Sequence, residues 1–505
     1  MTFGEPPIWS PPPEPPPFPY APSRRKTNPV IVVLAIVGTF ALLAGGAAYI
    51  FRDTRHGPPH PKEWDPRVLD IVQFDEQHRG LTFKQPVFVD FLDAQAYSDR
   101  VRTDQSSLTD DEKKQLAASE GELRALGLST STLNLLDATN QLVDTGTLAF
   151  YDPDTERVTV RGSDITVDLR VTLVHEFTHV LQDQHFGIGR KRTDKFSTSQ
   201  ERSGFRTVLE GDAVRIENEY IDGLSADDKA QYEQTHDQEV ASATAGLADV
   251  PVALQALQSA PYLLGPPLID LLDADGGETE VDGVFKDPPT TDEQLLDPPT
   301  LLSHQPAIDV QAPALPDGLS EDSQVDSGDF GALSWYIVLA ERIDPLVALQ
   351  AADGWGGDAY IAYQQNGNTC VRLNWQGDTS TDQQEMQDAL NQWVAAMPAG
   401  AASVTGDGGL LRLDACDLPN SGITLNNRAN DAIQIPAARS QFMLDAVKSG
   451  GKRIDAAFEY GDCVVHEIGF DNFVAADKAG SGGLPPDILA AIQAAAADCI
   501  AKAGG

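Results

Sequence analysis

The sequence predicts an α+β protein with two domains that follow one transmembrane helix. Residues 30–51 carry no charge and are long enough to cross a bilayer as a helix. Helical periodicity dominates the middle of the chain, which also contains one predicted hairpin, so a mostly helical domain with a small sheet is expected there. The last third alternates strand and helix patterns and holds all four cysteines, which indicates a smaller α+β domain with two disulfides.

Composition assigns the N-terminal segments. Residues 1–28 are rich in proline and predict a disordered cytoplasmic tail, residues 29–51 a transmembrane signal anchor, and residues 52–64 a stalk. A basic cluster at 24–26 precedes the anchor and places the N-terminus inside, so the remainder of a single-pass membrane protein is expected outside the cell. A cleaved signal peptide is the alternative, although its apolar core is normally shorter.

Periodicity and turn residues define the elements of the first domain, 65–328. They are, in order, helices over 109–126 and 131–142, a hairpin of strands 148–151 and 158–160, a helix over 164–186, a helical segment that contains Glu210 and runs to about residue 220, further helices within 225–300, and an acidic loop over 305–327. Ser163 or Asp164 is expected to cap helix 164–186, and Gly187 to end it.

The C-terminal α+β domain, 329–505, is expected to alternate helices and strands. Its predicted elements are a helix over 330–343, a tight turn with a buried tryptophan at 354–358, a strand over 370–375, a helix over 381–397, a strand over 410–413, a helix over 440–448, a β-like segment over 456–465 and a helix over 486–501. Each cysteine pair flanks one helical stretch, so Cys370–Cys416 and Cys463–Cys499 are the favoured disulfides among three possible pairings.

One motif carries most of the functional information: His175-Glu176-Phe177-Thr178-His179 has the form H-E-x-x-H. On a helix the two histidines lie four residues apart, so both imidazoles leave one face at a spacing that suits two ligands of a tetrahedral zinc. Glu176 lies one position round, where a carboxylate can take a proton from metal-bound water.

A catalytic zinc takes three protein ligands and leaves a fourth position open. Glu210, on the following helix, is the first candidate for the third ligand, because the small Ala213 on the same face allows two helices to approach closely. His185, six residues after the second histidine, is another candidate, although Gln182 stands where a sharp turn would need glycine. Asp183 is the third candidate, one helical turn on and far along the axis.

The stretches 172–186 and 209–213 resemble the gluzincin-type H-E-x-x-H neutral zinc metallopeptidases. Within that class they resemble a bacterial membrane-anchored or secreted group with H-E-F-T-H-x-L-Q-D-Q-H-F and E-G-D-A motifs. Further matches lie at 261–262, 288–294 and 354–358, so the resemblance spans roughly residues 62–385.

The resemblance implies a zincin-like metallopeptidase fold for the first domain and one Zn²⁺ per chain, held by His175, His179 and Glu210. It also implies Glu176 as general base and proton shuttle. Val214 departs from the thermolysin-like members, which carry an aspartate there that orients a zinc histidine. Asp212 or Glu217 is expected to take that outer position.

Peptide hydrolysis also needs a donor for the tetrahedral oxyanion. Tyr262 is the first candidate, because it lies in a proline-flanked segment of the resembling group, and Tyr220, Arg215 and His304 are alternatives. Edge strands of zincins bind extended substrate by strand addition, and the hairpin before the motif is expected either to do so or to be ordinary sheet.

The formal charge of −40 and the pI near 4.3 argue against nucleic acid as a partner. The sequence thus predicts a membrane-anchored extracytoplasmic zinc metallopeptidase that acts on peptide or protein substrates. Its alternatives are a catalytically inactive zincin-fold surface scaffold for envelope assembly and a hydrolase of non-peptide amides. An intact Glu176 favours the enzyme, because a scaffold does not need that base.

Overall fold

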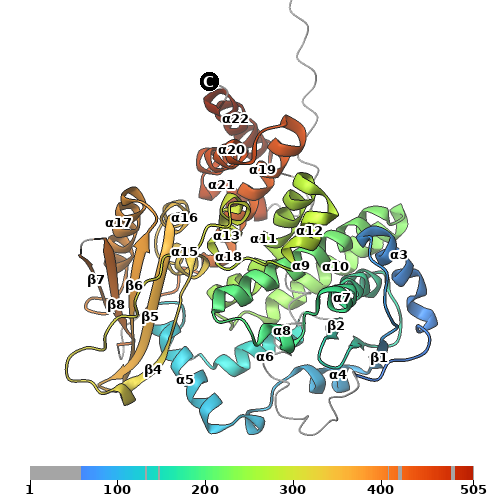
Figure 1. Ribbon diagram of the computed structural model, residues 1–505, viewed down its shortest axis with the longest axis horizontal. Helices are drawn as coiled ribbons and strands as arrows, with labels where there is room; N and C mark the ends of the chain where they lie inside the picture. The colour runs from blue at the N-terminus through green and yellow to red at the C-terminus, as the bar shows by residue number, and fades with distance from the viewer. Residues whose placement is uncertain are drawn as a thin grey trace, which may run out of the picture.

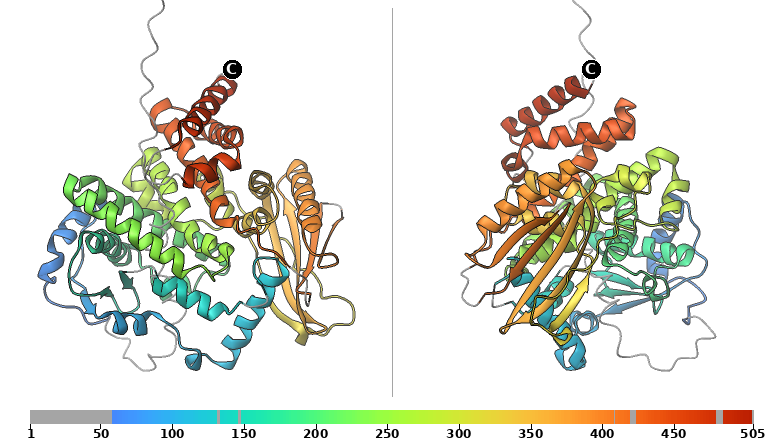
Figure 2. Two further views of the ribbon diagram at one scale, coloured as in Figure 1. Left: turned by 180° about the vertical axis from the view of Figure 1, so that it is seen from behind. Right: turned by 60° about the vertical axis from the view of Figure 1, so that its left-hand side comes forward.

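The structure, a computed structural model, is mostly helical and contains two small sheets (Figures 1 and 2). It describes residues 58–130, 133–145, 148–407, 409–418, 423–478 and 484–503. The five-stranded sheet occupies one side of the molecule, the three-stranded sheet lies on the opposite side among the N-terminal helices, and the last three helices extend from one end (Figures 1 and 2).

The expected α+β fold behind one transmembrane helix is therefore corrected. Across the described ranges the chain forms a mostly helical protein with two small sheets and two disulfides, and none of its helices has the length and apolarity that a bilayer crossing requires. The longest helices, α9 and α11, have 25 residues each, but α9 is charged along its length and α11 packs into the core. The predicted tail (1–28), anchor (29–51) and start of the stalk lie outside the described residues.

The small sheet has the strand order β1-β3-β2, with β1 parallel and β2 antiparallel to β3. Its strands are β1 (Phe88–Leu92), β2 (Ala149–Asp152) and β3 (Arg157–Arg161). The predicted hairpin is confirmed as β2 and β3, while β1 was not predicted. Asp152 closes the turn by accepting hydrogen bonds from the backbone N of Asp154 (3.0 Å) and the Thr155 hydroxyl (2.7 Å). Because β2 is an edge strand, the sheet presents it to α7.

Helices make up the rest of the N-terminal half. They are η2 (Pro66–Val68), α3 (Leu69–Arg79), α4 (Ala94–Val101), η3 (Gln105–Ser107), α5 (Asp110–Ala125), α6 (Leu135–Thr145), α7 (Val167–Phe186), α8 (Arg190–Thr193), α9 (Ser199–Gly223), α10 (Ala226–Gly246), α11 (Val252–Gly276), α12 (Glu278–Val284), α13 (Glu293–Leu296) and α14 (Pro298–Leu302). Helix α7 lies between β2, α3 and α9, and α9 packs along α11. These contacts bury α7 on almost every side, so its motif is held rigidly.

The larger sheet is antiparallel throughout, in the order β4-β5-β6-β8-β7. Its region contains η4 (Glu321–Ser323), β4 (Gln324–Gly328), α15 (Ala332–Ala340), α16 (Pro345–Asp353), β5 (Trp355–Gln365), β6 (Asn368–Gly377), α17 (Ser380–Ala396), β7 (Ala402–Asp407) and β8 (Leu410–Cys416). The predicted turn at 354–358 is wrong, because Trp355 begins β5. Trp355 is buried as expected, and its indole donates to Asp358 (2.7 Å). The loop expected over 305–327 also ends early, since β4 starts at Gln324.

The chain ends in a group of helices: α18 (Ala429–Ala432), α19 (Gln434–Gly450), α20 (Ile454–Ile468), α21 (Phe470–Lys478) and α22 (Pro486–Ala503). The β-like segment predicted over 456–465 is wrong, because it lies inside α20. Its aromatic and β-branched residues favour a strand, but Ala457, Gly461, Val464 and Ile468 are buried at helical spacing against α19 and α22. Both expected disulfides are present: Cys370–Cys416 joins β6 to β8, and Cys463–Cys499 joins α20 to α22.

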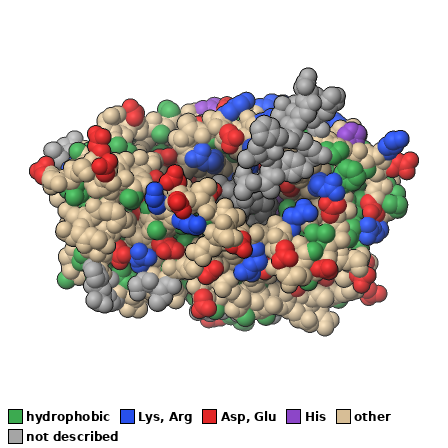
Figure 3. All heavy atoms as spheres, turned by 90° about the horizontal axis from the view of Figure 1, so that it is seen from below, with side chains coloured by type: hydrophobic (Ala, Val, Ile, Leu, Met, Phe, Trp, Pro, Cys, Tyr) green, Lys and Arg blue, Asp and Glu red, His purple; other side chains and the backbone are tan. Residues whose placement is uncertain are grey.

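The main hydrophobic core is continuous from Val68 to Val465, so helices of the N-terminal half and the larger sheet share it. β4, which ends at the expected domain boundary, pairs with β5 of the C-terminal sheet. On the face shown in Figure 3, acidic and basic side chains are interspersed and hydrophobic ones are scattered.

Candidate metal centre

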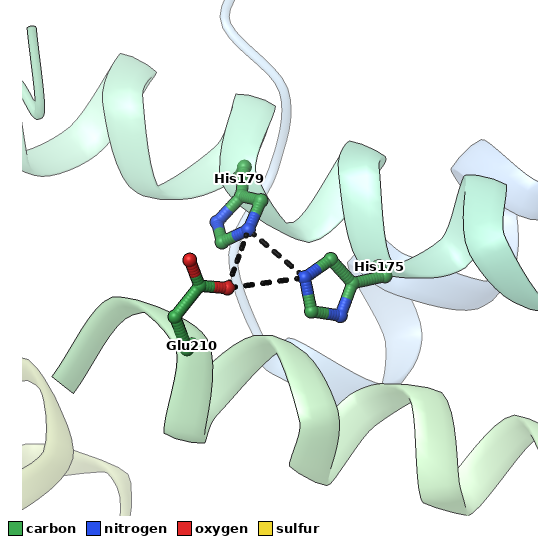
Figure 4. Close-up of side chains that lie close together, drawn as sticks. All are labelled: His175, His179 and Glu210. Atoms are coloured by element: carbon green, nitrogen blue, oxygen red, sulfur yellow. Dashed lines mark hydrogen bonds and ion pairs between the residues drawn. The ribbon is translucent and has the colours of Figure 1, made fainter. Parts of the chain in front are cut away.

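The H-E-x-x-H motif lies in the middle of α7, and both ends of this helix are fixed by local chemistry. Thr166, rather than the expected Ser163 or Asp164, is the N-cap and accepts a hydrogen bond from the backbone N of Leu169 (3.2 Å). Gly187 ends the helix with φ = 68°, as predicted. From this helix, His175 and His179 face Glu210 on α9 (Figure 4).

The three side chains form a small triangle of potential metal ligands (Figure 4). His175 Nε2 lies 3.1 Å from His179 Nε2, and each of these nitrogens lies 3.3 Å from Glu210 Oε2. Zinc bonds of about 2.0–2.1 Å in a tetrahedron hold neighbouring ligand atoms about 3.3 Å apart. The triangle therefore has the size that one zinc ion requires, and all three residues are buried.

Outer partners fix how both imidazoles point. His175 Nδ1 lies 3.0 Å from Glu217 Oε2, and His179 Nδ1 lies 2.8 Å from Gln182 Oε1. Each Nδ1–H can donate outward, which leaves the Nε2 lone pairs of both rings directed at the centre of the triangle. Of the two residues expected to orient a triangle histidine from outside, Glu217 therefore contacts one directly and Asp212 does not.

Asp212 acts one step further out, through Gln182. The amide of Gln182 donates to the Leu209 carbonyl (3.0 Å) and to Asp212 Oδ2 (3.1 Å), which ties α7 to α9. Asp212 in turn accepts from two buried cations, Arg79 (2.8 Å) and Arg215 (3.1 Å). This buried network fixes the distance between the two helices that carry the triangle.

The electrostatics of the triangle favour a positive charge at its centre. Burial opposes a charged His175, but hydrogen bonds to Glu210 and Glu217 outweigh it and raise the pKa of His175 well above its usual value. Burial also opposes a charged Glu210, yet the two imidazoles hold the pKa of this carboxyl well below its usual range. A Zn²⁺ ion can supply the same positive charge to neutral imidazoles and an ionised carboxylate.

The predicted base, Glu176, is buried beside this triangle. Its Oε2 accepts a hydrogen bond from the backbone N of Tyr151 in the edge strand β2 (2.7 Å). Burial raises the pKa of Glu176, while the nearby imidazoles of His175 and His179 lower it in part. The carboxylate is therefore fixed between the motif histidines and the sheet edge.

Of the four oxyanion candidates, Tyr262 alone lies at the triangle. Its ring stacks on the His175 imidazole, with centroids 6.3 Å apart and planes inclined by 28°. Burial raises the pKa of Tyr262 well above its usual value, and the Glu210 carboxylate adds to this effect. The other candidates lie elsewhere: Tyr220 bonds Arg170, Arg215 bonds Glu278, and His304 is exposed near Asp287.

The two alternative ligand candidates, His185 and Asp183, lie outside the triangle. His185 Nε2 lies 2.9 Å from the Thr82 carbonyl and outside the triangle. Asp183 accepts hydrogen bonds from the Tyr151 hydroxyl (2.7 Å) and the backbone N of Ile188 (2.9 Å). Both side chains therefore stabilise the C-terminal end of α7.

Two residues at the site were not found from the sequence. Arg206 lies one turn before Glu210, with its Nε 3.8 Å from Glu210 Oε1 and its guanidinium 5.7 Å from the Tyr262 ring centre. Its Nε and Nη2 are buried without a hydrogen-bond partner among the described residues. Asp75, on α3, is fully buried with both oxygens unpartnered, and burial raises its pKa while His175 lowers it. Arg206 lies four residues before Glu210, so helical spacing could have identified it from the sequence. No local sequence pattern distinguishes Asp75.

The approach of α11 to α9 depends on two glycines. A Cβ atom at Gly211 would lie 2.5 Å from the backbone carbon of Gly265, and one at Gly265 would lie 2.5 Å from the Thr207 carbonyl. Gly211 directly follows Glu210, so this crossing brings Tyr262 of α11 to the triangle. The small residues that permit this crossing of α9 and α11 are therefore Gly211 and Gly265.

We expect Gly211→Ala to destabilise the protein by about 1–3 kcal/mol, because neither backbone can move away from the new methyl group without displacing a helix. Urea unfolding followed by circular dichroism measures the change. Gly223→Ala is the matched control on the same helix, since a Cβ there meets no atom within 4 Å. Equal stability of the two variants would show that the helix crossing is not tight.

A family model described as "Domain of unknown function (DUF8575)" matches residues 319–448. The matched stretch begins just before η4, contains the five-stranded sheet with α15 to α18, and ends inside α19. None of the three residues of the triangle belongs to it. No curated protein and no solved structure matches the chain.

Proposed function

We propose that this protein is a zinc-dependent peptide hydrolase in which His175, His179 and Glu210 bind the ion and Glu176 is the general base. The spacing of the three ligand atoms, 3.1–3.3 Å, is the observation that carries the proposal. The outward hydrogen bonds of both Nδ1 atoms support it, since they orient the two nitrogens toward one point.

A zinc ion held by His175, His179 and Glu210 would supply Lewis-acid chemistry, which would polarise a scissile carbonyl and make a water acidic enough to be deprotonated near neutral pH. Glu176 accepts the proton of the attacking water and later passes it to the leaving amine. Tyr262 and Arg206 are proposed to stabilise the oxyanion, because the first lies against His175 and the second has buried N–H groups without partners. The edge strand β2 is proposed to align an extended peptide beside Glu176.

Two further observations bear on this proposal. The Tyr151 amide holds Glu176 in position, which a purely structural scaffold does not require. The two disulfides favour an oxidising compartment, so we propose that the enzyme acts outside the cytoplasm.

Metal content tests the proposal first. We expect the purified protein to contain about one zinc per chain, to lose hydrolysis of a quenched casein substrate on treatment with a chelator, and to recover it when zinc is restored. Elemental analysis and fluorescence measure the two quantities on the same samples. A folded protein that neither retains nor responds to zinc would exclude the proposed site, and a zinc-loaded protein without hydrolysis would favour the scaffold.

Glu217→Gln tests the outer support of the site. We expect zinc affinity to fall about 10–100-fold, because an amide accepts the His175 Nδ1–H less strongly than a carboxylate and can present the wrong group. Competition with a chromophoric chelator measures the affinity. Glu280→Gln, an exposed change of the same kind on α12, is the control and is expected to leave the affinity unchanged.

A further inference from the structure

A strongly acidic pocket of about 840 Å³ lies between α13, α14, α16, α17 and α20, outside the metal triangle. Eight of its sixteen lining residues are aspartate or glutamate, and neither lysine nor arginine is among them. Helix α13 packs on α16, and the following helix α14 packs on α20, so segments from distant parts of the sequence meet at the pocket (Figure 1). The pocket therefore gathers negative charge that local sequence does not bring together.

Few cations compensate this charge. Arg439, fully buried behind the pocket, is shared between Asp353 (2.5 and 2.7 Å) and Asp462 (3.1 Å). Within the described part of the chain, no ion pair reaches Glu293, Asp297 or Asp378. At least three carboxylates of the pocket thus lack a cationic partner.

Glu293 is the residue that points to a ligand. It is only 2% exposed, it lines the pocket, and its Oε1 has no hydrogen-bond partner. Oδ1 of the neighbouring Asp297 has none either. Burial and the surrounding carboxylates raise the pKa of Glu293 to about 9 and that of Asp297 to about 7. Glu293 is therefore protonated near neutral pH while its buried oxygen lacks a partner, and a bound ammonium group would supply that partner and favour the ionised carboxylates.

The pocket suits an organic cation better than a bare metal ion. Among the described residues, the only three acidic, histidine or cysteine ligands that converge within 4.8 Å belong to the triangle on α7 and α9. The volume lies within the range of pockets for organic ligands, about 300–1,000 Å³. Phe458 adds an apolar surface beside the carboxylates, on which an aliphatic chain can lie.

We propose that this pocket binds an organic polyamine, a flexible aliphatic chain that carries two or more ammonium groups. Glu293 and Asp297 bind one ammonium group at the buried end. Asp378 faces the pocket from the loop before α17 and binds another. The proposal concerns a second site and does not depend on the hydrolytic function.

Isothermal titration of the full-length protein with spermidine tests this site. We expect saturable binding that weakens about tenfold or more in Glu293→Gln/Asp297→Asn, because two charge-assisted hydrogen bonds are lost. The control Glu321→Gln/Asp322→Asn makes the same two substitutions in an exposed turn and is expected to bind within about twofold of the parent. Circular dichroism checks that both variants fold, and the pocket variant should be at least as heat-stable as the parent, since two unpartnered acids are gone.

Titration with other cations shows which kind of ammonium compound or metal ion the pocket prefers. A short lysine peptide that binds the same pocket more tightly than spermidine supports the same ammonium chemistry carried on a polypeptide. Absence of spermidine binding overturns the proposal, as does equal weakening by both double variants, which would show only non-specific charge attraction. Preferential binding of calcium over spermidine overturns it in favour of a metal site.

Discussion

Glu176→Gln is expected to abolish most of the hydrolysis while leaving the zinc in place. The change keeps the shape of the side chain and an oxygen that can accept the hydrogen bond from the Tyr151 amide. In the parent protein this bond is 2.7 Å long. An amide, however, cannot take a proton from water at neutral pH. General base catalysis typically contributes about 10²–10⁴-fold, so kcat should fall by about that factor. Zinc content should remain near one per chain, because Glu176 is not one of the three ligands.

The measurement is kcat with a quenched peptide substrate, together with zinc analysis of the same preparation. Glu122→Gln is the control, because Glu122 is a partly buried glutamate with one oxygen that lacks a hydrogen-bond partner, and it lies on α5 away from the site. Unchanged turnover in Glu176→Gln would remove the assigned base. Loss of zinc in the same variant would show instead that the carboxylate supports the ligands.

Local sequence was sufficient to predict the two helices that carry the triangle and the three residues that meet in it. The period of 3.6 residues and Gly187 define α7, and four-residue spacing alone puts His175 and His179 on one face. The choice of Glu210 over His185 also followed from local chemistry, since Gln182 continues the helix where a metal loop would need glycine. The hairpin was predictable from its turn residues for the same reason.

The rest of the site depends on contacts between distant segments. Tyr262 meets His175 only because Gly211 and Gly265 let α9 and α11 cross closely. Asp75 reaches the site because α3 packs on α7, and no pattern within α3 distinguishes it from an exposed acid.

The secondary-structure prediction was wrong where local composition and tertiary packing favour different structures. Residues 456–465 are rich in strand-forming side chains, but α19 and α22 offer a helix-shaped surface, and the Cys463–Cys499 disulfide joins the segment to α22. A Cβ at Gly461 would lie 2.6 Å from the Arg439 carbonyl, so α19 and α20 are in close contact. Tertiary packing of this kind overrides local preference.

Replacing Glu210 should have the largest effect on metal binding. Glu210→Gln keeps the volume of the buried side chain, but a neutral amide oxygen is a poor zinc ligand and leaves two imidazoles to hold the ion. We expect zinc affinity to fall by about 10³-fold or more, and hydrolysis to fall with it. His185→Ala is the control, since the imidazole of His185 lies against the Thr82 carbonyl and outside the triangle. The zinc affinity of this variant should stay within about twofold of that of the parent protein.

The same pair of variants separates metal binding from folding. Glu210 also lies beside Arg206 and Tyr262, so a loss of zinc caused by unfolding must be excluded by circular dichroism and by a cooperative thermal transition. The two variants are then compared by chelator competition at one pH. If His185→Ala loses more zinc than Glu210→Gln, the third ligand lies on α7 and the triangle with α9 is not the metal site. If Glu210→Gln loses more, the carboxylate from the second helix completes the site, which is the step on which a hydrolytic function rests.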